Sequence, residues 1–173
     1  LVAPNSERST NANHSPNHQQ TACLTTDEQV FPMNKRFPSI ILATAVVPWD
    51  EQYRFQEDLF RRQVRQLRDG LTPYIYLFGT AGEGYAVSES QFDRIVEVFR
   101  DEMLPGAHPM VGVVSLSLQT IVERIERCRD RDIRTFQISL PCWGTLTDHE
   151  VDIFFEHTCG RFPDCQFLHY NLP

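Results

Sequence analysis

Between residues 39 and 170, short apolar runs alternate with amphipathic segments in a regular cycle. The apolar runs cover residues 39–47, 74–78, 110–114, 135–140 and 165–170. Segments with helical periodicity follow the first four runs, over residues 55–69, 88–103, 118–130 and 147–155. Two of these segments open on a capping-box pattern, Ser88 to Gln91 and Thr147 to Glu150. Continuous apolar runs are typical of strands buried on both faces, so the alternation predicts an α/β fold with a parallel sheet and crossover helices.

Two architectures share this local pattern of about five β-α units. A doubly wound sheet of the flavodoxin type fits a chain of 173 residues. A (β/α)8 barrel needs about 250 residues, so on that interpretation the chain is a partial TIM barrel. In both cases residues 1–38 are predicted to form a flexible polar tail, because they lack an apolar period. Residues 39–173 are then the folded domain.

Charge and cysteine content exclude several classes of function. The formal net charge of −7 lies entirely in residues 39–173, because the acidic and basic residues of 1–38 cancel. An acidic domain argues against nucleic acid as a partner. The five cysteines form no C-x-x-C pair, so neither a disulfide framework nor a metal site is predicted. No apolar run reaches the length of about 20 residues that spans a membrane, and a cytoplasmic location is the default expectation.

Two motifs follow predicted strands and carry candidate chemistry. Residues 79–84 (GTAGEG) form a glycine-rich loop in which backbone N–H groups and the Thr80 hydroxyl are suited to an anion, although such a loop is often a plain turn. Residues 170–173 (YNLP) end the fifth predicted strand. A tyrosine there is either a structural residue or, at the mouth of a barrel, a group that moves protons.

The order of these motifs resembles the dihydrodipicolinate synthase / N-acetylneuraminate lyase family of Schiff-base aldolases. In that family a G-T-T-G-E loop follows the second strand and Y-N-x-P follows the fifth. The resemblance runs over residues 40–173 and includes residues 44–49 (TAVVPW) and 141–143 (PCW). It implies the N-terminal portion of an aldolase-type TIM barrel.

The resemblance also implies roles for individual residues. Gly79, Thr80 and the backbone N–H of Ala81 would bind the carboxylate of a pyruvate-like 2-oxo acid. Tyr170 would relay protons during imine formation and carbon–carbon bond chemistry. Trp143 takes the place of an aromatic that in some members enters a neighbouring subunit's site, so a homo-oligomer is expected for the full-length protein. No metal or organic cofactor is implied.

Departures from the family pattern bear on activity. Ala81 replaces the second threonine of the family's pair, which removes one hydroxyl from the expected site. The family's Schiff-base lysine lies on the sixth strand, whereas the single lysine of this sequence, Lys35, precedes the first predicted strand. Without an amine no imine forms. The chain is therefore expected to be truncated before the lysine and inactive alone.

Two alternatives remain open at this point. One is a non-catalytic truncated paralogue that associates with a full-length family member. The other is an independent doubly wound domain that binds a phosphorylated ligand at residues 79–84. Strand order separates the fold alternatives, because a barrel requires the order 1-2-3-4-5 and the flavodoxin type requires 2-1-3-4-5.

Overall fold

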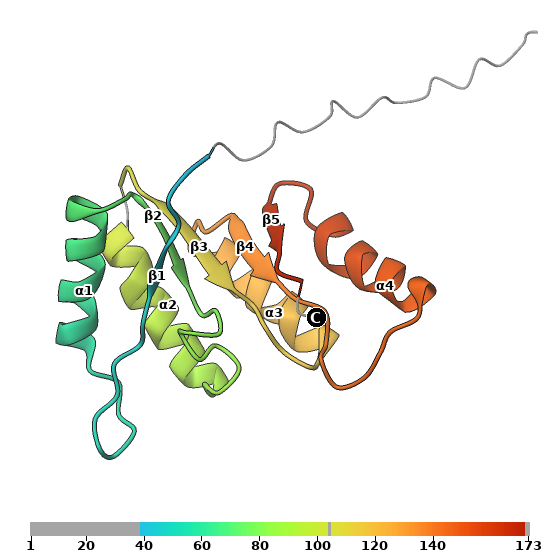
Figure 1. The fold of residues 1–173 in the computed structure, drawn as a ribbon, viewed down its shortest axis with the longest axis horizontal. Helices are drawn as coiled ribbons and strands as arrows, with labels where there is room; N and C mark the ends of the chain where they lie inside the picture. The colour runs from blue at the N-terminus through green and yellow to red at the C-terminus, as the bar shows by residue number, and fades with distance from the viewer. Residues whose placement is uncertain (1–38, 104, 172–173) are drawn as a thin grey trace, which may run out of the picture. The chain divides into compact units, whose positions relative to one another are not determined.

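The computed structural model describes residues 39–103 and 105–171, where five parallel strands form one sheet (Figure 1). The predicted tail over 1–38 and the last two residues of the YNLP motif lie outside this description. The strands are β1 (Ala43–Ala45), β2 (Tyr74–Leu77), β3 (His108–Gly112), β4 (Thr135–Ile138) and β5 (Gln166–His169). The helices are α1 (Glu57–Gly70), α2 (Glu89–Met103), α3 (Leu118–Arg129) and α4 (Asp148–Phe155), and α4 continues into a π-helical turn, Glu156–Gly160.

The strand order in the sheet is β1-β2-β3-β4-β5. A doubly wound sheet of the flavodoxin type would place β1 between β2 and β3, so that alternative is wrong. Sequential parallel strands with a helix between each pair are the arrangement of a (β/α)8 barrel, here over five strands. The predicted partial TIM barrel is confirmed by this order and by the structural matches reported below.

The first strand is shorter than its apolar run. Of the predicted residues 39–47, only Ala43–Ala45 pair with β2. The backbone N–H of the next residue, Val46, donates to the Gln63 side chain of α1 at 2.9 Å. The chain therefore leaves the sheet where a helix side chain takes over its hydrogen bond. Both predicted capping boxes are present, at the starts of α2 and α4.

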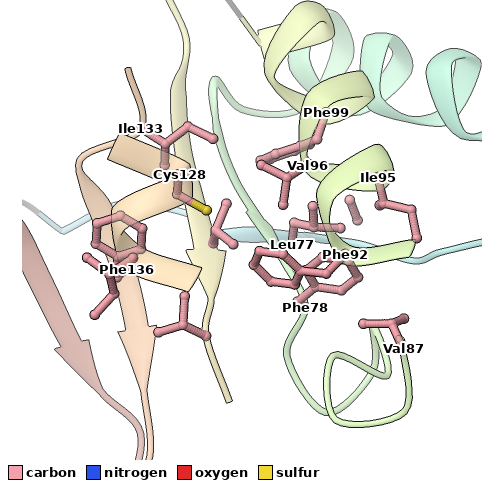
Figure 2. Close-up of a cluster of buried hydrophobic side chains, with 14 of the residues drawn as sticks. Leu77, Phe78, Val87, Phe92, Ile95, Val96, Phe99, Cys128, Ile133 and Phe136 are labelled. Carbon is pink, nitrogen blue, oxygen red and sulfur yellow. The ribbon is translucent and has the colours of Figure 1, made fainter. Parts of the chain in front are cut away.

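One row of apolar side chains runs across the sheet and builds the core. Strand register places Ala45, Leu77, Val111, Phe136 and Phe167 side by side on β1 to β5. The first four are fully buried, and Phe167 packs against the cluster. Figure 2 shows Leu77 close to Phe92 of α2, and Phe136 near Cys128 of α3. This row therefore faces the helices.

Residues alternating with that row face away from the helices and are of a different kind. They include Tyr76, paired with Met110, and Gln137, paired with Gly112. At the amino ends of β2 and β3, the rings of Tyr74 and His108 stack with centroids 4.3 Å apart. We call this the inner face, because it corresponds to the interior side of a barrel. It carries hydroxyl, amide and imidazole groups that the helix-facing row lacks.

An ion-pair cluster joins α1 to α2. The Glu102 carboxylate is 5% exposed and accepts hydrogen bonds from Arg65 Nε at 2.6 Å and Arg61 Nη1 at 3.0 Å. The helical spacing of Arg61, Arg65 and Arg68 predicts a solvated outer face, and Arg65 is exposed as predicted, whereas Arg61 and Arg68 are partly buried. The apolar periodicity of residues 55–69 also places Leu59 on the buried stripe, but Leu59 is exposed. The buried residues of α1 are Phe60 and Val64.

Close backbone packing surrounds Phe78, the residue after β2. Phe78 is fully buried with a left-handed φ of 67°, a region that bulky residues rarely adopt. Its ring stacks on Phe92 of α2 with centroids 5.1 Å apart. A Cβ placed on Gly112 would lie 2.2 Å from the Phe78 carbonyl oxygen, and one on Gly84 would lie 2.6 Å from the same atom. These glycines are required by contact with Phe78.

We predict that Gly112→Ala destabilises the fold by about 1–3 kcal/mol, the usual cost of overpacking a filled core. The added methyl group would meet the Phe78 backbone, which cannot move without disturbing the buried ring. Gly144→Ala is the matched control, because no atom lies within 4 Å of its added Cβ. Urea unfolding measures both free energies, and equal stabilities for the two variants would contradict this account.

Glu102 provides a pH-dependent prediction. Hydrogen bonds from Arg65 lower the pKa of Glu102 below its ordinary value of 4.5, against the opposing effect of burial. A lowered folded-state pKa stabilises the fold above the unfolded-state pKa, and this stabilisation is lost as pH falls through the folded-state pKa. We expect Glu102→Gln to lower the unfolding free energy at pH 7 by about 1–3 kcal/mol.

The difference between wild type and Glu102→Gln should shrink as pH falls below 4.5, because the unfolded state then takes up a proton at Glu102, and folded Glu102 becomes neutral only as pH falls through its lowered pKa. Glu97→Gln serves as the control, since Glu97 is an exposed residue paired with Arg94 on the same helix. Denaturant titrations at pH 7 and pH 4 measure both differences. A pH-independent difference for Glu102 would show that shape, not charge, determines its effect.

Candidate active site

Three loops follow the carboxyl ends of the parallel strands (Figure 1). They are residues 79–84 after β2, residues 139–147 after β4, and residues 170–171 after β5. All strands of a parallel sheet end at the same edge, which is where ligands bind in α/β folds. The two motifs identified from the sequence thus lie on one edge of the sheet.

The loop of residues 79–84 is folded by internal hydrogen bonds that leave its tip open. The Glu83 N–H donates to the Thr80 carbonyl at 3.3 Å, and the Gly84 N–H donates to the Gly79 carbonyl at 3.4 Å. Thr80 and Ala81 are exposed. Among the described residues, no hydrogen bond uses the N–H of either residue or the Thr80 hydroxyl. Two backbone donors and one hydroxyl are therefore free for a ligand.

A buried arginine fastens this loop to the elements behind it. Arg124 of α3 is 4% exposed, and its Nη1 donates to the carbonyl oxygens of Gly84 at 3.2 Å and Val114 at 2.8 Å. Its guanidinium lies 4.5 Å from the centroid of the Phe92 ring and bonds to Glu89 at 2.7 Å. The loop tip is thus free while its base is tightly held.

Tyr170 lies at the end of β5 on the inner face. Its N–H donates to the Ile138 carbonyl at 2.9 Å, which extends the pairing of β4 and β5 by one residue, and its side chain is half exposed. The preceding residue, His169, points to the helix side, where its ring meets Phe155 of α4 edge-on at 5.2 Å. Strand alternation thus places the two neighbours on opposite sides of the sheet, and His169 is exposed.

Two further polar residues lie between the motifs, and the sequence pattern does not single them out. The Tyr76 hydroxyl donates to Gln137 Oε1 at 3.2 Å. A Cβ on Gly79 would fall 1.8 Å from the Tyr76 oxygen, so this hydroxyl lies directly against the start of the 79–84 loop. Burial, and to a lesser degree the charge of Tyr170, raises the pKa of Tyr76 to about 12. Strand alternation is the sequence signal that could have identified these two residues, because it places residues 76 and 137 on the inner face.

A cavity of about 440 Å³ opens between the ends of β4 and β5. Its lining residues are Ser139, Leu140, Pro141, Cys142, Gly144, Thr145, Leu146, Val151 and Asn171. The structure thus brings Asn171 of the last motif together with the loop after β4. Thr80 and Ala81 do not line this cavity, and among the described residues no hydrogen bond joins Thr80 to Tyr170. Trp143 is 88% exposed and is not among the residues that line the cavity.

Metal ligands do not gather at this edge. In the part of the chain that the structure describes, no group of three or more His, Cys, Asp or Glu side chains is arranged to hold a metal ion. The described cysteines, Cys128, Cys142, Cys159 and Cys165, are unpaired thiols. Among the described helices, none has the length and apolar character that crossing a membrane requires.

Comparison with known proteins shows which proteins this chain is similar to. No family model matches the chain. A curated relative, the 4-hydroxy-tetrahydrodipicolinate synthase of Prochlorococcus marinus (strain MIT 9211), is 21% identical over 133 residues, which are 77% of this chain and 44% of the relative. The chain therefore spans less than half the length of this relative.

Solved structures give the same result for the fold. The Clostridium difficile protein CdNal, crystallised with mannosamine, matches with a TM-score of 0.72 at 21% identity, over 77% of this chain and 46% of that one. A putative dihydrodipicolinate synthetase from Pseudomonas aeruginosa matches with a TM-score of 0.72 at 19% identity, over 76% and 45%. Proteus mirabilis N-acetylneuraminate lyase matches with a TM-score of 0.69 at 17% identity, over 75% and 45%.

Both loop motifs lie at one edge of a sequentially ordered parallel sheet, as the sequence resemblance implied. The curated and structural neighbours, each matched over about three quarters of this chain, support its assignment to the dihydrodipicolinate synthase / N-acetylneuraminate lyase family, and the chain covers less than half the length of each of these proteins.

Proposed function

We propose that this chain is the N-terminal part of a lyase that joins or splits pyruvate-like 2-oxo acids through a lysine Schiff base. The free N–H groups and hydroxyl at the tip of the 79–84 loop are the observation that carries this proposal. Three donors on one loop suit a carboxylate, which accepts hydrogen bonds only. The rigid base of the loop, held by Arg124, keeps those donors in place.

Tyr170 would serve as the proton relay on the same edge. Its half-exposed hydroxyl lies on the inner face, where a bound 2-oxo acid would present its carbonyl carbon. Loss of water from a carbinolamine, and making or breaking of the adjacent carbon–carbon bond, both require a proton to move. The Tyr170 phenol can both donate and accept a hydrogen bond, so it could take part in either step.

The electron sink would come from an amine outside this sequence. Lys35 is the single lysine of the 173 residues and precedes β1 in sequence. In the proposed enzyme the reactive lysine follows Tyr170 on a later strand, as in the family pattern. The 173-residue chain would then bind a 2-oxo acid without converting it.

Subunit contact and location belong to the same proposal. Trp143, exposed on the loop after β4, would contact a neighbouring subunit in a homo-oligomer, since a tryptophan 88% exposed has large apolar surface in water. The unpaired thiols fit a reducing compartment such as the cytoplasm. The second candidate function, a non-catalytic subunit that associates with a full-length family member, draws on the same exposed tryptophan.

Thr80→Val is predicted to weaken pyruvate binding about tenfold or more, because a hydrogen bond to a charged group contributes about 1.5–3 kcal/mol. Valine keeps the shape of the side chain and removes the donor. Titration of the 173-residue chain with pyruvate, followed by NMR, gives the dissociation constants. Thr120→Val on α3 is the control and should bind as the wild type does. Equal affinities for wild type and Thr80→Val would remove Thr80 from the site.

Borohydride reduction in the presence of pyruvate tests the position of the amine. We expect no reduced adduct on the 173-residue chain, and an adduct on a lysine downstream of Tyr170 in a longer product of the same gene. Mass spectrometry of peptides locates the modified residue. Lys35→Arg controls for adventitious reaction at the single lysine present.

The outcomes of this trapping experiment separate the two candidate functions. A specific adduct on the 173-residue chain would contradict the proposed position of the nucleophile. A longer gene product that contains the downstream strands but forms no adduct would favour the non-catalytic subunit.

A further inference from the structure

Gln137 has a fixed orientation on the inner face. Its side chain is 3% exposed, and its Nε2 contacts the Ile138 carbonyl oxygen at 3.1 Å and Ser139 Oγ at 2.8 Å. A backbone carbonyl can only accept, so the amide nitrogen must face Ile138 and the amide oxygen must face Tyr76. The direction of every hydrogen bond around Gln137 follows from this one contact.

Tyr76 must then act as the donor to Gln137. The Tyr76 pKa of about 12, raised chiefly by burial, keeps its hydroxyl protonated at neutral pH. Because Tyr76 Oη lies against Gly79, where no Cβ would fit, the ring has little freedom to turn away. Tyr76 therefore holds the oxygen end of the Gln137 amide, which leaves the nitrogen end for Ser139.

Ser139 receives a hydrogen bond and has its own proton to give. Its Oγ accepts from Gln137 Nε2, and among the described residues no acceptor is found for the Ser139 hydroxyl proton. Ser139 lines the cavity of about 440 Å³ at the ends of β4 and β5. Strand alternation puts it on the inner face with Gln137, next to Tyr170, whose N–H bonds to Ile138.

The cavity lining defines the kind of group that Ser139 would meet. None of the residues that line it is charged, and its other polar side chains are Cys142, Thr145 and Asn171. A carboxylate or phosphate would lose hydration there without a countercharge. An uncharged oxygen, in a hydroxyl or carbonyl group, can accept from Ser139 without that cost.

We propose that Ser139 is a specificity-determining residue that donates a hydrogen bond to an uncharged substrate oxygen, and that Gln137 and Tyr76 are positioning residues for this donor. The inference rests on the proposed function, because the substrate oxygen is taken to lie on the portion of a 2-oxo acid beyond its carboxylate and carbonyl group. Hydroxylated 2-oxo acids would be preferred to their deoxy counterparts.

The test compares two probes that differ by one hydroxyl group, 4-hydroxy-2-oxopentanoate and 2-oxopentanoate. Their dissociation constants for the 173-residue chain are measured by NMR titration, and their ratio is the selectivity. One hydrogen bond between uncharged groups corresponds to a selectivity of about 2- to 12-fold for the hydroxylated compound. Ser139→Ala should bring the ratio to about one while the affinity for 2-oxopentanoate is retained.

Two variants test the positioning residues through the same ratio, which a general loss of stability would not change. Tyr76→Phe removes the donor that fixes the Gln137 amide and should lower the selectivity part of the way. Gln137→Glu keeps the acceptor for Tyr76 but turns the group facing Ser139 into an acceptor. The Ser139 proton would then point to the carboxylate, and the ratio should fall to about one.

Thr135→Val is the matched control, because it removes a hydroxyl from the opposite end of β4 and should leave the selectivity unchanged. An unchanged selectivity in Ser139→Ala, with both probes still bound, would overturn this inference and leave the proposed function intact. Binding of neither probe to the unmodified chain would overturn the proposed function, and this inference with it.

Discussion

Burial of an apolar row on the helix-facing side of the sheet is the constraint on which the rest of the structure depends. The row Ala45, Leu77, Val111 and Phe136 is buried under the helices, and no charged or hydrogen-bonding side chain interrupts it. Apolar surface of this extent supplies the main driving force for folding. The inner face instead carries the polar residues Tyr76, Gln137 and Ser139, of which Gln137 and Ser139 are also buried.

Charged groups connect the elements that this burial brings together. Glu102 links α1 to α2, and Arg124 links α3 to the start of α2 and to the loops after β2 and β3. Both groups are nearly buried, and buried charges are tolerated where each has several hydrogen-bond partners. These ion pairs fix the relative positions of the elements, because each pair joins residues that are more than thirty positions apart in sequence.

Local patterns predicted the elements of this fold well. Apolar runs located all five strands, and the two capping boxes located the starts of α2 and α4, because these signals depend on neighbouring residues. The length of β1 and the exposure of Leu59 were predicted less well. Each depends on how α1 packs against the rest of the fold, which neighbouring residues do not determine. The strand order was open until the loop motifs favoured a barrel.

The candidate site was predictable only in part. Thr80 and Tyr170 could be identified because their motifs are contiguous in sequence. Tyr76, Gln137 and Ser139 lie on two strands about sixty residues apart, and the hydrogen bonds that join them follow from register. Their roles and those of the motif residues stay predictions to be tested by binding.

The left-handed backbone at Phe78 has a mechanical consequence. Its ring is stacked on Phe92 of α2, while its carbonyl oxygen lies against Gly84 and Gly112. Such a backbone state costs about 1–3 kcal/mol, and here the buried ring holds it in place. Displacement of α2 would separate Phe92 from the ring that it stacks on, so the position of α2 and the backbone state at the start of the glycine-rich loop depend on each other.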